Sequence, residues 1–427
     1  MRVLFATVPA PAHVYPLVPL AWALRAAGHE VVVASHPDVA DTVTAAGLTA
    51  VSLGERNFLT SEVPPARAAV LDRITDELEL GPDETDFRTA IRHFMLETFG
   101  LYHPGRTPDP GSFTDELVGF ATAWRPDLVI WDPLCFPAAV AARAAGAAHA
   151  RILHAFDHFG WARQRSTERA ATDRMADLMR PTLDRYGIAF GEDLLVGQWT
   201  LDLKPPRTRL PVRVDSRPLR RIPYNDEAPL PRWLHARRPG RPRVCLTLGV
   251  SRRDFFAGGD EHPVAEFFDL AAGLDLELVA TLDAGQLASV DTVPDNVRVL
   301  DYVPLTALLP TCSAVVHHGG AGTLAVATAH RVPQLIIPAV GGADRAETGQ
   351  YVASTGAGLV LTGTQATPEV LRDSLLRLLT EPGFQEGAGR LHQEWLDTPS
   401  PAATVPLLEE LTAQHRTGTL PPAPARG

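Results

Sequence analysis

The chain has 427 residues, of which 45% are hydrophobic and 21% charged, so the sequence predicts a globular protein of two or three domains and excludes a disordered chain. No apolar stretch approaches the roughly 18–20 residues that span a bilayer, which predicts a soluble protein. The net charge of −11 and the lack of a basic run argue against nucleic acid as a partner.

The first strand is predicted at residues 3–8 (VLFATV), a short apolar run typical of a parallel strand buried on both faces. A signal peptide is the alternative for this N-terminus, but the apolar run ends at a proline and a structured pattern follows directly. Helical spacing at 17–27 stops at Gly28, and residues 30–35 (EVVVAS) form the next predicted strand. The chain therefore opens with a βαβ unit.

Residues 126–132 predict another strand, and the alanine-rich segment near 138–145 predicts a helix that stops at Gly146. Residues 54–120 are more polar and irregular, as expected of an insertion around a binding site. We assign residues 1–215 to a first Rossmann-like domain.

A second array of strands and helices follows a proline-rich segment. Residues 205–242 hold nine prolines, and we place the linker at 216–240. Two arrays of this kind predict an α/β protein with two Rossmann-like domains whose parallel sheets face a cleft, the second domain spanning 241–394. A helix at about 395–416 is expected to pack back on the first domain, and residues from 417 onward to form a frayed tail. The short strands of the second domain are expected at 243–249, 276–282, 297–300, 314–316, 334–337 and 358–361.

The sharpest motif is a glycine-rich turn after the predicted strand at 314–316, with the sequence HHGGAGT from His317 to Thr323. Glycines let the backbone approach a ligand, and the N-terminus of the next helix offers unpaired N–H groups and a partial positive charge. His318 can add a ring N–H, so the pattern predicts a diphosphate site. The alternative is a plain strand–helix turn with two packed histidines. A P-loop is excluded because the sequence has no GK[ST], and GxGxxG is absent from this turn.

Short segments along nearly the whole chain carry a family resemblance: VYPL at 14–17, WRPDLVIW at 124–131, IPYN at 222–225, PRWL at 231–234, CLTLG at 245–249, PDNVR at 294–298 and YVP at 302–304. With the HHGG motif, they resemble the GT-B fold glycosyltransferases that use nucleotide-diphosphate sugars. The segments at 222–234 and 245–249 are similar to the subgroup that transfers deoxysugars to macrolide and anthracycline polyketides, which includes the erythromycin desosaminyltransferase.

This resemblance implies an acceptor-binding first domain and a donor-binding second domain. It implies that Tyr302 and the backbone of Val303 face the nucleobase, that Ser251 lies near the phosphates or the sugar, and that Asp344 reaches the sugar hydroxyls beside Arg345. The implied pyrophosphate contacts are His318, Gly319, Gly320, Gly322 and Thr323.

Two positions depart from the family pattern. Many relatives carry Gln where this chain has Arg345, which favours a sugar with fewer hydroxyls than glucose. Relatives that use UDP usually carry Glu eight residues after the position of His318, where it binds the ribose diol, but this chain has Val326. An apolar side chain would leave a 2′-hydroxyl unpaired, so a dTDP-sugar is the expected donor.

His13 is the candidate general base. It follows the first predicted strand, at the edge where open α/β sheets bind ligands, and an imidazole near neutrality can take the proton of an acceptor hydroxyl. Asp132 ends the strand at 126–132 and could orient the imidazole, a role that the resemblance also implies. The alternatives are a structural histidine and an aspartate that forms a turn with Pro133.

The remaining candidate side chains give weaker predictions about an acceptor pocket and a metal site. His154, Phe156 and His158 could line a pocket for an apolar acceptor, although aromatic segments more often belong to a core. The three cysteines lack metal-ligand spacing, which favours a reducing cytoplasm and no zinc. Asp275 and Glu277 alternate as on the exposed face of a strand, so no metal and no cofactor are expected.

The predicted function is an inverting, metal-independent glycosyltransferase that moves a deoxysugar from a dTDP-sugar to a hydroxyl of a polyketide-like acceptor. A nucleotide-sugar epimerase or hydrolase of the same fold and a non-catalytic nucleotide-sugar-binding module are the alternatives. The resemblance also raises a helper protein related to cytochrome P450 as a partner, and a homodimer is left open.

Overall fold

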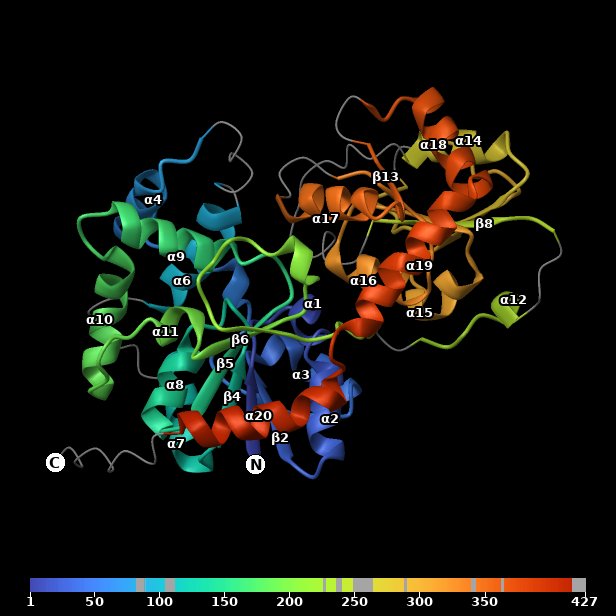
Figure 1. Cartoon of the computed structure of the whole chain (residues 1–427). Coiled ribbons are helices and arrows are strands. Elements are labelled where there is room, and N and C mark those ends of the chain that lie inside the picture. Colours follow the sequence, from blue (N-terminus) through green and yellow to red (C-terminus); the bar gives the residue numbers. More distant parts are fainter. Residues whose placement is uncertain are drawn as a thin grey trace. The chain divides into compact units, whose positions relative to one another are not determined.

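The computed structural model describes residues 1–81, 88, 90–103, 112–225, 228–235, 240–248, 264–287, 290–338, 343–361 and 365–416; the side chains at 93, 94, 235 and 343–346 lie outside this description. The chain forms two compact units, Met1–Arg220 with Pro399–Gly427, and Arg221–Thr398 (Figure 1). Among the described residues, no helix combines the length and the apolar character that crossing a membrane requires. The predicted tail from residue 417 lies outside the described residues.

The first unit is built on a parallel sheet with the strand order β3-β2-β1-β4-β5-β6-β7. The apolar run at the start of the chain forms β1, whose last four residues are buried, and β4 and β5 are buried throughout. A parallel sheet covered on both faces requires such continuous apolar strands. The strands are β1 Arg2–Ala6, β2 Glu30–Ser35, β3 Thr49–Ser52, β4 Leu128–Trp131, β5 Ala148–Leu153, β6 Trp199–Asp202 and β7 Ser216–Pro218.

The helices of this unit begin and end at the expected local signals. Ser112 caps α7 by accepting the N–H of Asp115, and Gly146 ends α8 with a left-handed φ of 67°. The α-helices are α1 Pro11–Val14, α2 Val18–Ala26, α3 Ala40–Ala45, α4 Pro65–Glu77, α6 Glu97–Tyr102, α7 Phe113–Trp124, α8 Pro137–Ala145, α9 His158–Arg169, α10 Arg174–Tyr186, α11 Asp193–Val196 and α20 Pro401–His415. A π-helical turn at Ile91–Leu96 and 3₁₀ turns at Pro37–Val39, Phe58–Thr60 and Pro206–Thr208 complete the unit.

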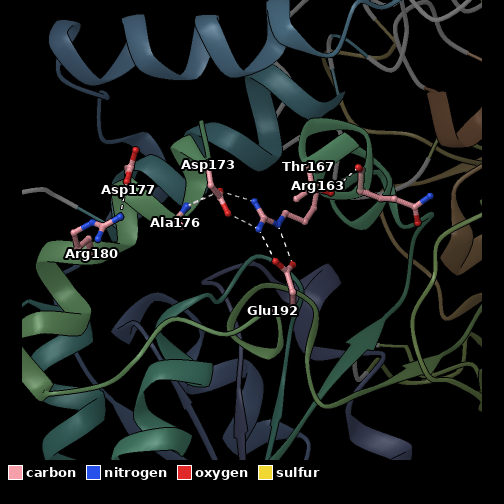
Figure 2. Close-up of polar contacts among 8 residues, drawn as sticks. Arg163, Thr167, Asp173, Ala176, Asp177, Arg180 and Glu192 are labelled. Atoms are coloured by element: carbon pink, nitrogen blue, oxygen red, sulfur yellow. Dashed lines mark hydrogen bonds and ion pairs between the residues drawn. The ribbon is translucent and has the colours of Figure 1, made fainter. Parts of the chain in front are cut away.

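A buried guanidinium joins three of these helices (Figure 2). Arg163 on α9 is 3% exposed and donates to both carboxylate oxygens of Asp173, each at 2.6 Å, and to Glu192 at 2.5 and 3.0 Å. Asp173 also caps α10 by accepting the N–H of Ala176. Burial alone would raise the pKa of Asp173, but the hydrogen bonds from Arg163 lower it, so the carboxylate is charged. The cluster fixes α10 and the start of α11 against α9.

The last helix of the chain, α20, belongs to the first unit and packs against α2 and β5. Two polar contacts help to fix its position: Glu409, within the helix, lies 3.1 Å from His29, and Arg416, just after the helix, lies 2.6 Å from Asp127. These contacts tie the amino ends of β2 and β4 to a segment from the end of the chain.

The second unit repeats the architecture with the strand order β10-β9-β8-β11-β12-β13, again parallel. Relative to the order along the chain, each sheet follows the 3-2-1-4-5-6 pattern of a Rossmann fold. The strands are β8 Arg243–Thr247, β9 Glu277–Thr281, β10 Val297–Leu300, β11 Ala314–His317, β12 Gln334–Ile336 and β13 Gly358–Val360. The helices are α12 Arg232–His235, α14 Val264–Ala272, α15 Leu305–Leu308, α16 Ala321–Ala329, α17 Ala343–Ser354, α18 Pro368–Thr380 and α19 Pro382–Asp397, with a 3₁₀ turn at Leu309–Thr311.

The predicted α/β class with two Rossmann-like domains is confirmed, whereas several strands were not predicted. Strand β5 (AHARIL) was missed because His149 and Arg151 interrupt its apolar pattern. Both side chains are buried, and each contacts a carboxylate outside the strand. His149 contacts Asp193, which is 44 positions away, and Arg151 donates to Asp157, just before α9. The short strands β3 and β6 mix polar and apolar residues in the same way.

The structure divides the predicted linker, residues 216–240, between the two units. Ser216–Pro218 forms β7, an edge strand that pairs with Thr200–Asp202 of β6. Residues from Arg221 onward belong to the second unit. A three-residue edge strand that ends in proline leaves no alternating or apolar pattern by which the sequence could reveal it.

Candidate functional site

In both sheets the strand order reverses beside the first strand of the unit, between β1 and β4 and between β8 and β11. Ligands of open α/β sheets bind outside the carboxyl ends of the strands at this switch point. In the first unit, α1 after β1 carries His13, and Asp132 directly follows β4. In the second unit, the glycine-rich turn directly follows β11. The topology therefore places both predicted motifs where ligands are expected.

His13 and Asp132 are brought together across 119 positions of sequence. His13 Nδ1 lies 2.7 Å from Asp132 Oδ2, and the N–H of Leu134 donates to Oδ1 at 2.9 Å. Asp132 is completely buried, which by itself would raise its pKa. Contacts with His13 and His154 instead hold this pKa well below its usual value. An ionised carboxylate only accepts hydrogen bonds, so we assign the proton of neutral His13 to Nδ1 and the lone pair to Nε2.

His154 is the third member of this group. The sequence predicted it only as a residue lining an acceptor pocket and did not predict its contacts with Asp132 and His13. It follows β5, and its Nε2 lies 2.9 Å from Asp132 Oδ2 and 3.1 Å from His13 Nδ1. The two imidazole rings are 4.4 Å apart and nearly perpendicular. The position of His154 after a strand of the same sheet was the signal that could have placed it here.

Two imidazoles and one carboxylate are also ligands that a transition metal could use, and their ligand atoms lie within 4.8 Å of one another. The two nitrogens lie 2.7 and 2.9 Å from Asp132 Oδ2, which are hydrogen-bond distances, and 3.1 Å from each other. Ligand atoms around a tetrahedral zinc ion would be about 3.3 Å apart, given bonds of about 2.0 Å. Elsewhere, Asp275 and Glu277 pair with Arg241 and Arg243, each at 2.8 Å.

Phe156 lies in the wall of a small pocket at the carboxyl ends of β5 and β6. Lys204, the one lysine of the sequence, lies in the same wall with its Nζ 4.0 Å from the centre of the Phe156 ring. Asp202 also lines the pocket, and burial raises its pKa. His158, at the start of α9, is buried and does not line this pocket. Lys204 and Asp202 were not predicted as site residues.

The glycine-rich turn of the second unit is shaped by two histidines. His317 is buried and accepts the N–H of Gly319 at Nδ1, and its Nε2 lies 3.0 Å from Gln334. Burial lowers the pKa of His317 to about 4, so this ring is neutral. Gly319 has a φ of 91°, and a Cβ on Gly320 would lie 2.7 Å from His318 Nε2. The left-handed φ of Gly319 favours glycine there, and a side chain at Gly320 would require the His318 ring to move.

Helix α16 begins directly after this turn. Gly320 is its N-cap without any side-chain cap, and Gly322 and Thr323 lie in its first turn, where Gly322 is exposed. The first N–H groups of an α-helix have no partner within the helix and carry a partial positive charge. The arrangement can therefore bind an anion, and the phosphates of a nucleotide have the matching chemistry.

The remaining residues that were predicted to bind the nucleotide-sugar donor differ in their exposure to solvent. Tyr302 is partly exposed just after β10, whereas Val303 is 2% exposed and belongs to a core cluster that also contains Val326. Ser251 lies outside the described residues, and for Asp344 and Arg345 only the backbone at the start of α17 is described.

Comparison with known proteins gives matches over most of the chain. The model of erythromycin biosynthesis protein CIII-like N-terminal domains matches residues 22–249, and that of the corresponding C-terminal domains matches residues 265–411. The chain is 45% identical over 433 residues to the aclacinomycin-T 2-deoxy-L-fucose transferase of Streptomyces galilaeus, covering 97% of each. It is 42% identical over 440 residues to the 10-deoxymethynolide desosaminyltransferase of Streptomyces venezuelae, covering 100% of each.

Among solved structures, the glycosyltransferase VinC in complex with dTDP is similar with a TM-score of 0.79 and 37% identity, covering 97% of this chain and 100% of VinC. These matches confirm the resemblance that the sequence motifs predicted, and with it the GT-B fold.

Proposed function

The chain belongs to the erythromycin biosynthesis protein CIII-like family of glycosyltransferases, and from this membership we propose that it moves a deoxysugar from a dTDP-sugar to a hydroxyl group of a polyketide-like acceptor, with inversion at the anomeric carbon. Relatives named for the transfer of 2-deoxy-L-fucose and desosamine support the sugar class, and VinC, which binds dTDP, supports the nucleotide.

The hydrogen bond between His13 and Asp132 is the observation that carries the mechanism. A hydroxyl is a poor nucleophile until its proton is removed, and His13 Nε2 would take that proton as the oxygen attacks the anomeric carbon. Asp132, 2.7 Å from Nδ1, would hold the ring in the required tautomer and stabilise the imidazolium that forms. The new carbon–oxygen bond forms as the bond to the diphosphate breaks, so a single displacement inverts the anomeric centre.

The second unit would stabilise the leaving dTDP. The first N–H groups of α16 and the ring of His318 would donate hydrogen bonds to the diphosphate as its negative charge increases. These donors supply the charge stabilisation without a divalent ion in the proposed reaction. Val326 favours dTDP over UDP, because a buried apolar side chain offers no partner to a ribose 2′-hydroxyl.

Incubating the purified protein with a dTDP-deoxysugar and a macrolide or anthracycline aglycone tests the proposal. A glycoside of inverted configuration together with free dTDP is the expected result. An epimerised or hydrolysed sugar in place of a glycoside, or nucleotide binding alone, would contradict it. We also propose that a helper protein related to cytochrome P450 activates the enzyme, so the assay is run with and without such a helper.

A further inference from the structure

We propose that His154 is a positioning residue, which holds the Asp132 carboxylate in place for His13 and controls how strongly His13 binds a proton. The inference rests on the proposed role of His13 as the base. Its starting point is that two imidazole nitrogens meet one carboxylate oxygen: His13 Nδ1 lies 2.7 Å and His154 Nε2 2.9 Å from Asp132 Oδ2.

The proton positions follow from the charge of Asp132. Its carboxylate is ionised and can only accept hydrogen bonds, so both nearby nitrogens must carry hydrogen. The two nitrogens lie 3.1 Å apart, but both are donors that converge on Oδ2 and do not bond to each other. Asp132 therefore selects one tautomer for each imidazole, with the proton on Nδ1 of His13 and on Nε2 of His154.

The carboxylate needs this second donor because it is completely buried. A buried charge is costly unless several hydrogen bonds compensate for its lost hydration. Leu134 donates to Oδ1 at 2.9 Å and His154 donates to Oδ2, so the plane of the carboxylate is held independently of His13. His13 can then exchange protons at Nε2 without losing its partner at Nδ1.

His154 also shares the negative charge of Asp132. A donor on Oδ2 takes part of the charge that would otherwise attract the His13 proton, so removing this donor should strengthen the hold of Asp132 on that proton. Among the described residues, Cys135 and Tyr102 also interact with Asp132, and burial raises the pKa of both, so they stay neutral. The two imidazoles therefore face one counter-charge, that of Asp132.

The test compares His154→Leu, which removes the donor, with His154→Gln, whose amide N–H can replace it. We expect His154→Leu to lower kcat about tenfold with little change in the KM of the dTDP-sugar, and to shift the acid limb of the pH–kcat/KM profile upward by about half a unit or more. His154→Gln should recover most of kcat. His29→Gln is the matched control, since His29 also lies beside a carboxylate, that of Glu409, at the opposite edge of the sheet.

Ring ¹⁵N spectra of histidine-labelled protein give a readout that does not depend on transfer. In the wild type, the His13 signals, assigned by their loss in His13→Ala, should show a protonated Nδ1, and His154→Leu should shift them. An unshifted pH profile and unchanged His13 signals in a folded His154→Leu variant would overturn the proposal, as would a rise in acceptor KM alone. If the wild type transfers no sugar, the proposed function fails, and the ¹⁵N spectra still decide the role of His154.

Discussion

Replacing Asp132 with asparagine tests the group that orients His13, because the substitution keeps the shape of the side chain and removes its charge. The N–H of Leu134 donates to Oδ1, so the amide oxygen of Asp132→Asn should stay at that position and the amide NH₂ should replace Oδ2. The NH₂ group would then donate to His13 Nδ1, which lies 2.7 Å away. The ring proton of neutral His13 would move to Nε2, where it blocks the proposed base.

The size of the effect follows from the tautomer. Removing the charge of an orienting carboxylate in this way lowers kcat by about 10⁴ in a Ser-His-Asp triad, and general bases contribute about 10²–10⁴. We expect kcat to fall by about 10³–10⁴, which corresponds to about 4–5 kcal/mol of lost transition-state stabilisation. The affinity for dTDP should change by less than about twofold, because the proposed diphosphate contacts belong to the other unit.

The measurements are initial rates of glycoside formation, dTDP affinity by calorimetry and the melting temperature of each variant. Asp127→Asn is the matched control, because Asp127 also accepts from a backbone N–H, that of Arg2, but lies at the amino end of β4. A folded Asp132→Asn variant with more than about one-tenth of the wild-type kcat would refute the orienting role.

Three further substitutions test, in turn, the base role of His13, the binding of the diphosphate by His318 and the stability contributed by the pair of Arg151 and Asp157. His13→Ala should lower transfer by about 10²–10⁴ while dTDP binding, measured by calorimetry, stays unchanged; turnover near the wild-type rate would show that His13 is not the base. His318→Ala should weaken dTDP binding about tenfold or more, since hydrogen bonds to charged groups contribute about 1.5–3 kcal/mol; an unchanged dissociation constant would place the diphosphate elsewhere. Asp157→Ala should lower the free energy of unfolding in urea by about 3–5 kcal/mol, because it leaves the buried Arg151 without its bidentate partner. Asp177→Ala, which removes the exposed pair with Arg180 (Figure 2), should lower it far less, and equal losses for the two variants would contradict this account.

Much of the candidate site could be predicted from the sequence because it depends on local patterns. His13 and Asp132 each follow an apolar strand, and the carboxyl ends of neighbouring parallel strands meet at one edge of a sheet. The glycine-rich turn is likewise local, since Gly319, Gly320 and the helix after them lie within a few residues. A side chain at Gly320 would displace the His318 ring, which ties this glycine to its neighbour in the sequence.

Contacts between distant buried polar groups could not be predicted in this way. His154 appeared as one aromatic residue among several, and its contact with Asp132 depends on β5 lying directly beside β4. Lys204 follows β6 in a loop, yet it is only 5% exposed and its Nζ lies 4.0 Å from the centre of the Phe156 ring. Polar side chains of this kind interrupt the apolar pattern by which strands are predicted, as Arg151 does in β5.

The sequence by itself determined the class of fold, the positions of most principal strands along the chain, the glycine-rich turn and the family, because apolar periodicity, glycine positions and short motifs are properties of neighbouring residues. Only the tertiary structure decided which buried charges share a partner. That choice depends on strand order and on side-chain directions across the sheet, since a buried carboxylate such as Asp132 is stabilised by donors from separate strands that no sequence spacing specifies.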